Sequence, residues 1–176
     1  GRSALIFRSG AASVLAFVAA MHVAETGAWL ARKTEVVGEG RDAFRADLRG
    51  RFVNEALRAI HQSGAATMVV LPEGVTLNYL ARVENPTRYV NFMPPEMLLF
   101  GEEAWLAALR AAPPDLVLLV HKDTSEYGFP YFGRDYGRGV ADWLHSAYRP
   151  VGLLGDEPLQ PGTLFGMRVF ARGQEP

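Results

Sequence analysis

Two short stretches, Thr67–Leu71 (TMVVL) and Leu116–Val120 (LVLLV), decide the fold. Each is apolar and rich in branched side chains, and each is followed at once by polar or turn-forming residues. Strands that are buried on both faces have this composition, whereas half-exposed strands alternate apolar and polar side chains. The sequence therefore predicts two buried strands that each run straight into a polar loop.

Apolar residues at helical or strand spacing surround these two stretches. The predicted helices are Gly50–Gln62, Val75–Ala81, Glu102–Ala111 and one marked by Val140, Trp143, Leu144 and Ala147. The further predicted strands are a short one within Val83–Asn91, then Pro150–Leu154 and Phe165–Phe170. This order predicts an α/β fold, namely a three-layer, mostly parallel sheet with helices on both faces and an antiparallel C-terminal edge pair.

The composition is that of a globular protein. Of 176 residues, 49% are hydrophobic and 21% are charged, which excludes the disordered class. The net charge is −1 and the basic residues are dispersed, so we expect no nucleic-acid partner. The absence of cysteine excludes disulfides, thiolate metal ligands and a cysteine nucleophile.

The sequence predicts three parts: an apolar helix over residues 1–32 that precedes the α/β fold, a polar linker over 33–48, and a soluble α/β domain over 49–176. Because the first residue is Gly1, we expect the chain to be processed or to be a piece of a longer protein. Ser9–Ala24 contains no formally charged residue, and it reaches the length of a membrane span only if flanking residues contribute. The segment is interpreted as the end of a membrane helix, as a buried or amphipathic helix whose Leu15, Val18 and His22 face packs on the domain, or as a signal peptide.

Ligands of open α/β sheets bind beyond the carboxyl ends of the strands, where both polar loops are expected to lie. The first loop carries Glu73, which could act as a base, accept hydrogen bonds from a sugar or cap the following helix. The second loop begins with His121 and Lys122. A metal site here is not favoured because the potential ligands have no defined spacing, and Lys122 is expected to pair with Glu73 or Asp123. We predict no metal and no cofactor.

A single rim is predicted to carry all candidate ligand-facing residues, and none of them is assigned a catalytic role. The candidates are Glu73, Asn78, Tyr79, His121, Lys122, Asp123, Glu126, Tyr127, Arg134, Asp135 and Tyr136. Aromatic faces beside carboxylates and arginine suit a carbohydrate or a lipid headgroup, and they equally suit a packed structural loop.

Two long strings of residues carry a family resemblance: LPEGVTLNYLARVENPTRYVNFMPPE from Leu71, and PPDLVLLVHKDTSEYGFPYFGRDYG from Pro113. Together they resemble the C-terminal extracytoplasmic region of bacterial, family 39-like membrane glycosyltransferases related to protein mannosyltransferases. The resemblance covers residues 33–172. It implies sugar transfer from a polyprenyl-phosphate donor, with acidic catalytic residues in a loop that lies outside this chain. It also implies a bacterial inner-membrane location, with the soluble domain on the periplasmic side and a lipid-linked sugar or acceptor as partner.

Two other functions remain open. One is a free-standing or tethered α/β binding or interaction module without catalysis. The other is an independent hydrolase that uses Glu73, His121 or Asp123. A local similarity to nitrilase-like amidases, through Glu73 and Lys122, implies no amidase activity because the chain lacks the cysteine nucleophile.

Overall fold

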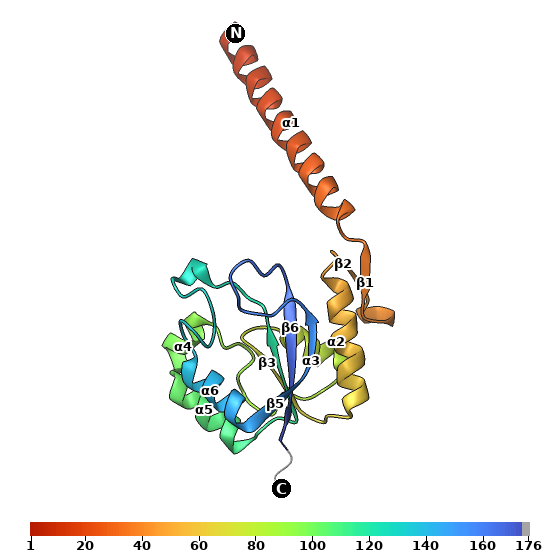
Figure 1. The fold of residues 1–176 in the computed structure, drawn as a ribbon. Helices are drawn as coiled ribbons and strands as arrows, with labels where there is room; N and C mark the ends of the chain where they lie inside the picture. Colours follow the sequence, from red (N-terminus) through yellow and green to blue (C-terminus); the bar gives the residue numbers. More distant parts are fainter. Residues whose placement is uncertain (174–176) are drawn as a thin grey trace.

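The computed structural model describes residues 1–173 as a long N-terminal helix that projects from an α/β domain (Figure 1). The domain is built on a four-stranded sheet with the strand order β3-β4-β6-β5. A separate two-stranded sheet, β1-β2, lies between the long helix and the domain.

The two stretches that decide the fold form adjacent parallel strands, as predicted. β3 is Met68–Leu71 and β4 is Leu116–Val120, with Val69 opposite Val117 in the register. Parallel pairing places the carboxyl ends of both strands at the same end of the sheet.

The sheet as a whole is mixed, so the expectation of a mostly parallel sheet is not confirmed. β6, Gly166–Arg172, pairs antiparallel with β4 on one side and with β5, Tyr148–Gly155, on the other. The predicted antiparallel C-terminal pair is present, but β6 lies inside the sheet because its apolar side chains are buried, and the more exposed β5 forms the edge. Pro150, which has no N–H to donate, fits that edge strand.

Helices flank the sheet close to where the periodicity predicts them. They are α2 (Gly50–Ser63), α3 (Val75–Ala81), α4 (Pro94–Phe100), α5 (Glu102–Ala111) and α6 (Arg138–Ala147). α4 was not predicted, and the strand expected within Val83–Asn91 is reduced to one bridge between Glu84 and Thr67.

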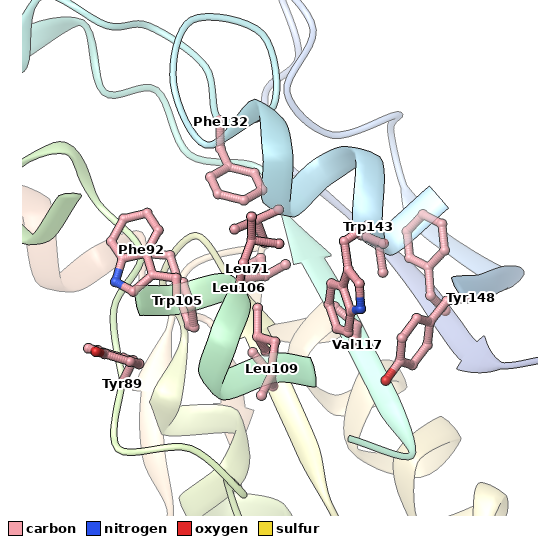
Figure 2. Close-up of a cluster of buried hydrophobic side chains, with 14 of the residues drawn as sticks. Leu71, Tyr89, Phe92, Trp105, Leu106, Leu109, Val117, Phe132, Trp143 and Tyr148 are labelled. Carbon is pink, nitrogen blue, oxygen red and sulfur yellow. The ribbon is translucent and has the colours of Figure 1, made fainter. Parts of the chain in front are cut away.

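Side chains of β3 and β4 alternate between two hydrophobic clusters, because successive residues of a strand point to opposite faces. Leu71 and Val117 belong to the cluster formed with α5 and α6, which also contains Trp105 and Trp143 (Figure 2). Met68, Val70, Leu116 and Leu118 belong to the cluster formed with α2 and α3.

The segment assigned to a linker is folded against the domain. β1 (Glu35–Val37) and β2 (Phe44–Ala46) pair antiparallel around a short 3-10 helix, Gly40–Asp42. Val37 is fully buried, and a Cβ added to Gly50 at the start of α2 would lie 2.9 Å from its side chain. Close packing of this kind needs a glycine, which a sequence pattern does not reveal.

The N-terminal helix, α1, spans Arg2–Ala31 and has no buried residue. Leu15 and Val18 are 70% and 56% exposed, so the expectation that this face packs on the domain is wrong. An 18-residue window of α1 has a mean hydropathy of 1.8, and the helix is long and apolar enough to cross a membrane. A signal sequence near an N-terminus meets the same criteria.

Candidate functional site at the carboxyl ends of β3 and β4

The turn after β3 presents Glu73 at the end of the sheet. Pro72 follows the strand and accepts a hydrogen bond from the Phe92 N–H at 2.7 Å. Gly74 has a φ of 151°, and a Cβ there would lie 2.5 Å from Cγ1 of Val70. Only glycine fits this conformation and this space, which lets α3 begin immediately at Val75.

The turn after β4 brings Lys122 to the same place. Its Nζ lies 3.1 Å from Oε2 of Glu73, and the two side chains are 35% and 47% exposed. The predicted pairing is therefore present, and the two polar loops meet at one end of the sheet. An ion pair this exposed contributes at most about 1 kcal/mol to stability, so it orients the loops more than it stabilises the fold.

His121 is held as a neutral imidazole. Its Nδ1 accepts a hydrogen bond from the Leu159 N–H at 3.0 Å, which places the proton of the neutral ring on Nε2. Burial lowers the pKa of His121, and the carboxylates of Asp123 and Asp156 oppose that shift only in part. The ring is therefore an uncharged hydrogen-bond donor near neutral pH.

Asp123 turns the second loop away from the strand. Its carboxylate accepts hydrogen bonds from the hydroxyl and the N–H of Ser125, and these bonds lower the pKa of Asp123. The next residue, Thr124, is fully buried and donates from its hydroxyl to backbone carbonyls of Phe129 and Pro130. The loop is thus tied to itself, and Glu126 and Tyr127 lie exposed on a short 3-10 helix, Ser125–Tyr127.

A pocket of about 670 Å³ opens between the two loops. We call it the rim pocket. Its lining combines one ion pair, one imidazole and several apolar side chains. The lining residues are Arg49, Glu73, Gly74, Val75, Thr76, Asn91, Val120, His121, Lys122, Asp123, Leu164 and Phe165.

Seven of the eleven predicted rim residues are not in the lining of the rim pocket, and two of the seven, Asn78 and Tyr79, lie on α3. Asn78 is buried, and its amide donates to the carbonyls of Met68 at 2.8 Å and Val83 at 3.2 Å, near the amino end of β3. Tyr79 donates from its hydroxyl to Asp42 at 2.7 Å. The helical turn between Glu73 and these residues carries them away from the rim. Asn78 therefore links α3 to β3, and Tyr79 links α3 to Asp42 in the segment before α2.

The predicted residues Arg134, Asp135 and Tyr136 form a compact turn outside the rim pocket lining. Asp135 accepts from the Tyr131 N–H at 2.8 Å and pairs with Arg134, whose side-chain hydrogen bond lowers the pKa of Asp135. Tyr136 packs edge-on against Phe132 in the core, and burial raises the pKa of Tyr136 to about 12. These contacts are those of a packed structural loop, which is one of the two alternatives that the sequence left open.

Sequence reasoning missed four lining residues that come from distant segments. Arg49 precedes α2, Asn91 precedes α4, and Leu164 and Phe165 precede β6. The one available signal was an apolar pair, Leu164-Phe165, after the turn-rich segment that joins the last two strands.

The rim pocket offers an ammonium, a guanidinium, two carboxylates and a neutral imidazole beside apolar side chains. Such groups can bind hydroxyls and an anionic group. Within residues 1–173, no group of three histidine, aspartate or glutamate side chains is arranged to hold a metal ion. No protein-family model, curated protein or solved structure matches the chain.

Proposed function

We propose that the chain is the C-terminal soluble domain of a polyprenyl-phosphate-sugar-dependent membrane glycosyltransferase of a bacterium, on the periplasmic side of the inner membrane. The catalytic carboxylates of that enzyme lie outside residues 1–176. The observation that carries the proposal is the position of the loops that line the rim pocket. The loops after β3 and β4 lie at the end of the domain from which α1 departs (Figure 1).

The chemistry of the rim pocket suits a lipid-linked sugar. Such a molecule presents a phosphate and several hydroxyls on an apolar chain. Lys122 supplies a point charge for the phosphate, and Glu73 can accept hydrogen bonds from hydroxyls. His121 adds an uncharged donor whose orientation is set by the Leu159 N–H.

The role of the domain is to hold a donor or acceptor, while the chemical step takes place elsewhere in the enzyme. Glu73 is already paired with Lys122, and Asp123 already accepts two hydrogen bonds from Ser125. The hydrogen bonds from Ser125 lower the pKa of Asp123, so its carboxylate is suited to binding and not to delivering a proton.

The test uses the protein encoded by the whole reading frame that contains this chain. Membranes with that protein are expected to transfer labelled hexose from a polyprenyl-phosphate hexose, and residues 1–176 alone are expected to transfer none. Lys122→Met in the whole protein should raise the KM for donor or acceptor about tenfold, the loss expected for one charge-assisted contact. Arg82→Met is the control, because Arg82 makes an ion pair with Asp42 away from the rim pocket.

A reading frame without an upstream multi-spanning segment would refute the proposal, and so would unchanged kinetics in Lys122→Met. The second candidate is then a tethered or free-standing α/β binding module without catalysis. The observation that favours this candidate is the self-contained loop around Asp123, which displays the exposed Tyr127 without forming a catalytic constellation.

A further inference from the structure

Four exposed apolar side chains surround the rim pocket. They are Phe44, Leu48, Val75 and Leu164, with 45%, 58%, 39% and 87% of their surface exposed. We call them the apolar rim patch. They come from β2, the residues before α2, the start of α3 and the loop before β6.

Two cavities that share lining residues connect the segments that carry these side chains. A second, smaller cavity is lined by Phe44 and shares Gly74, Thr76, Val120 and Phe165 with the rim pocket. Leu164 and Val75 line the rim pocket itself, and Leu48 directly precedes its lining residue Arg49. Exposed apolar side chains that gather around a pocket mark a contact with a partner or a membrane.

The end of α1 lies close to the apolar rim patch. Only Arg32, Lys33 and Thr34 separate α1 from β1, and three residues span at most about 11 Å. β1 in turn pairs with β2, which carries Phe44. β2 and the loop before β6 lie on the same side of the domain as the last turn of α1 (Figure 1).

The last turn of α1 has the features of a membrane–water boundary. The ammonium of Lys33 lies 3.8 Å from the ring centre of Trp29. Tryptophan and lysine gather at this level of a bilayer, because one presents an amphipathic ring and the other places its charge among headgroups. A bilayer crossed by α1 would therefore begin within a few residues of β1.

We propose that the apolar rim patch docks on the lipid bilayer that α1 enters, so that the rim pocket opens among the lipid headgroups. Phe44, Leu48 and Leu164 insert into the boundary between headgroups and acyl chains. The exposed Arg45 lies between Phe44 and Leu48 in the chain and contacts lipid phosphates. A ligand with a lipid tail then reaches Lys122 and Glu73 without leaving the membrane.

The proposal rests on the membrane anchoring that is part of the proposed function. The experiment distinguishes a failure of docking from a failure of the anchoring. The chain has no cysteine, so single cysteines can be labelled without background. The full chain is reconstituted in vesicles of phosphatidylethanolamine and phosphatidylglycerol, with an environment-sensitive fluorophore on Leu164→Cys, Leu98→Cys or Leu15→Cys. Lipids with a nitroxide near the headgroup then serve as quenchers.

Leu98 is the matched control, because it is 80% exposed and lies on α4, away from the apolar rim patch. We expect quenching of about twofold or more at position 164 and none at 98, since interfacial apolar side chains insert about 5–10 Å into the boundary region. Phe44→Cys gives a second reporter, with the same expectation, from a different segment of the patch.

Three results would overturn docking. Quenching at Leu15→Cys with none at positions 164 and 44 leaves α1 as the anchor and places the domain away from the bilayer. Equal quenching at positions 164 and 98 shows that no particular face is presented to lipid. The absence of quenching at position 15 as well removes the membrane anchor, and the proposed function fails together with the docking.

Discussion

The ammonium of Lys122 lies 3.1 Å from the carboxylate of Glu73, although the two residues follow different strands. The contact exists because β3 and β4 are parallel neighbours whose carboxyl ends coincide. Among residues 1–173, it is the one hydrogen bond or ion pair between the side chains of the two polar loops, and both of its residues line the rim pocket.

The Lys122–Glu73 pair is expected to contribute little to stability. A double-mutant cycle with Lys122→Met and Glu73→Gln should give a coupling energy below about 1 kcal/mol, because both side chains are partly exposed. The measurement is the free energy of unfolding in urea. A coupling well above that value would show that the pair is a structural clamp, and would weaken the assignment of these groups to ligand binding.

Asn78 is expected to matter for folding and not for ligands. Asn78→Ala removes the hydrogen bonds to the carbonyls of Met68 and Val83, and should lower the free energy of unfolding by about 1–3 kcal/mol. Asn54→Ala is the control, since Asn54 makes one bond to the Val36 carbonyl in an exposed setting and should cost less than about 1 kcal/mol. Equal losses in both variants would contradict the structural role given to Asn78.

Gly166 is expected to tolerate no side chain. A Cβ at this position would lie 1.7 Å from the backbone oxygen of Asp156, so Gly166→Ala should destabilise the domain by about 3 kcal/mol or more. Gly152→Ala, in the paired strand, would place its Cβ 3.8 Å from Val169 and should change stability by much less. The measurement is the midpoint of thermal unfolding of the two variants. Similar midpoints would show that Gly166 is not packed against the backbone of Asp156.

His121 is expected to make stability depend on pH. Because burial lowers its pKa below 6.5, the unfolded chain takes up a proton at a higher pH than the folded chain does. The contribution is therefore fully present above pH 6.5 and is lost as the pH falls below that value.

The slope of the unfolding free energy against pH, just below pH 6.5, should be smaller in His121→Gln than in the unchanged protein. His145→Gln on α6 controls for the loss of a histidine elsewhere. Urea unfolding at a series of pH values gives the slopes. An unchanged slope in His121→Gln would mean that the ring is not held neutral by the fold.

Local patterns predicted much of the fold. The predicted helices Val75–Ala81 and Glu102–Ala111 have the same bounds as α3 and α5. Such helices can be predicted because the signals lie within the segment itself and do not depend on residues far along the chain. The position of β6 between β4 and β5 was not predicted. Strand order depends on how the strands pack against one another in the folded protein, and the pattern within one strand does not show this. The packing of Val37 against Gly50 was also not predicted, because it joins two segments and neither segment alone indicates the contact.

The candidate site was predicted in part. Glu73, His121, Lys122 and Asp123 line one pocket because strand direction fixes where their loops lie. Asn78 was misplaced because one turn of α3 rotates it toward Met68, and Tyr136 belongs to the core because its ring meets Phe132. Arg49 and Leu164 join the pocket from segments that no local pattern connects to it.

The central claim is that the rim pocket binds a lipid-linked sugar, and the two lysines of the chain allow a direct test. Lys122 lies in the rim pocket and Lys33 lies at the end of α1, so methylation of lysine with ¹³C gives one reporter of the site and one internal control. Methylation keeps the charge that the ion pair requires.

The full chain in lipid nanodiscs is titrated with polyprenyl-phosphate mannose, and separately with mannose and with inorganic phosphate, while the ¹³C signals are followed by NMR. The predicted result is a saturable shift of the Lys122 signal with the lipid-linked sugar, a weaker shift with phosphate and no shift of Lys33. A Lys122 signal that stays in place at every concentration of the lipid-linked sugar would contradict the claim.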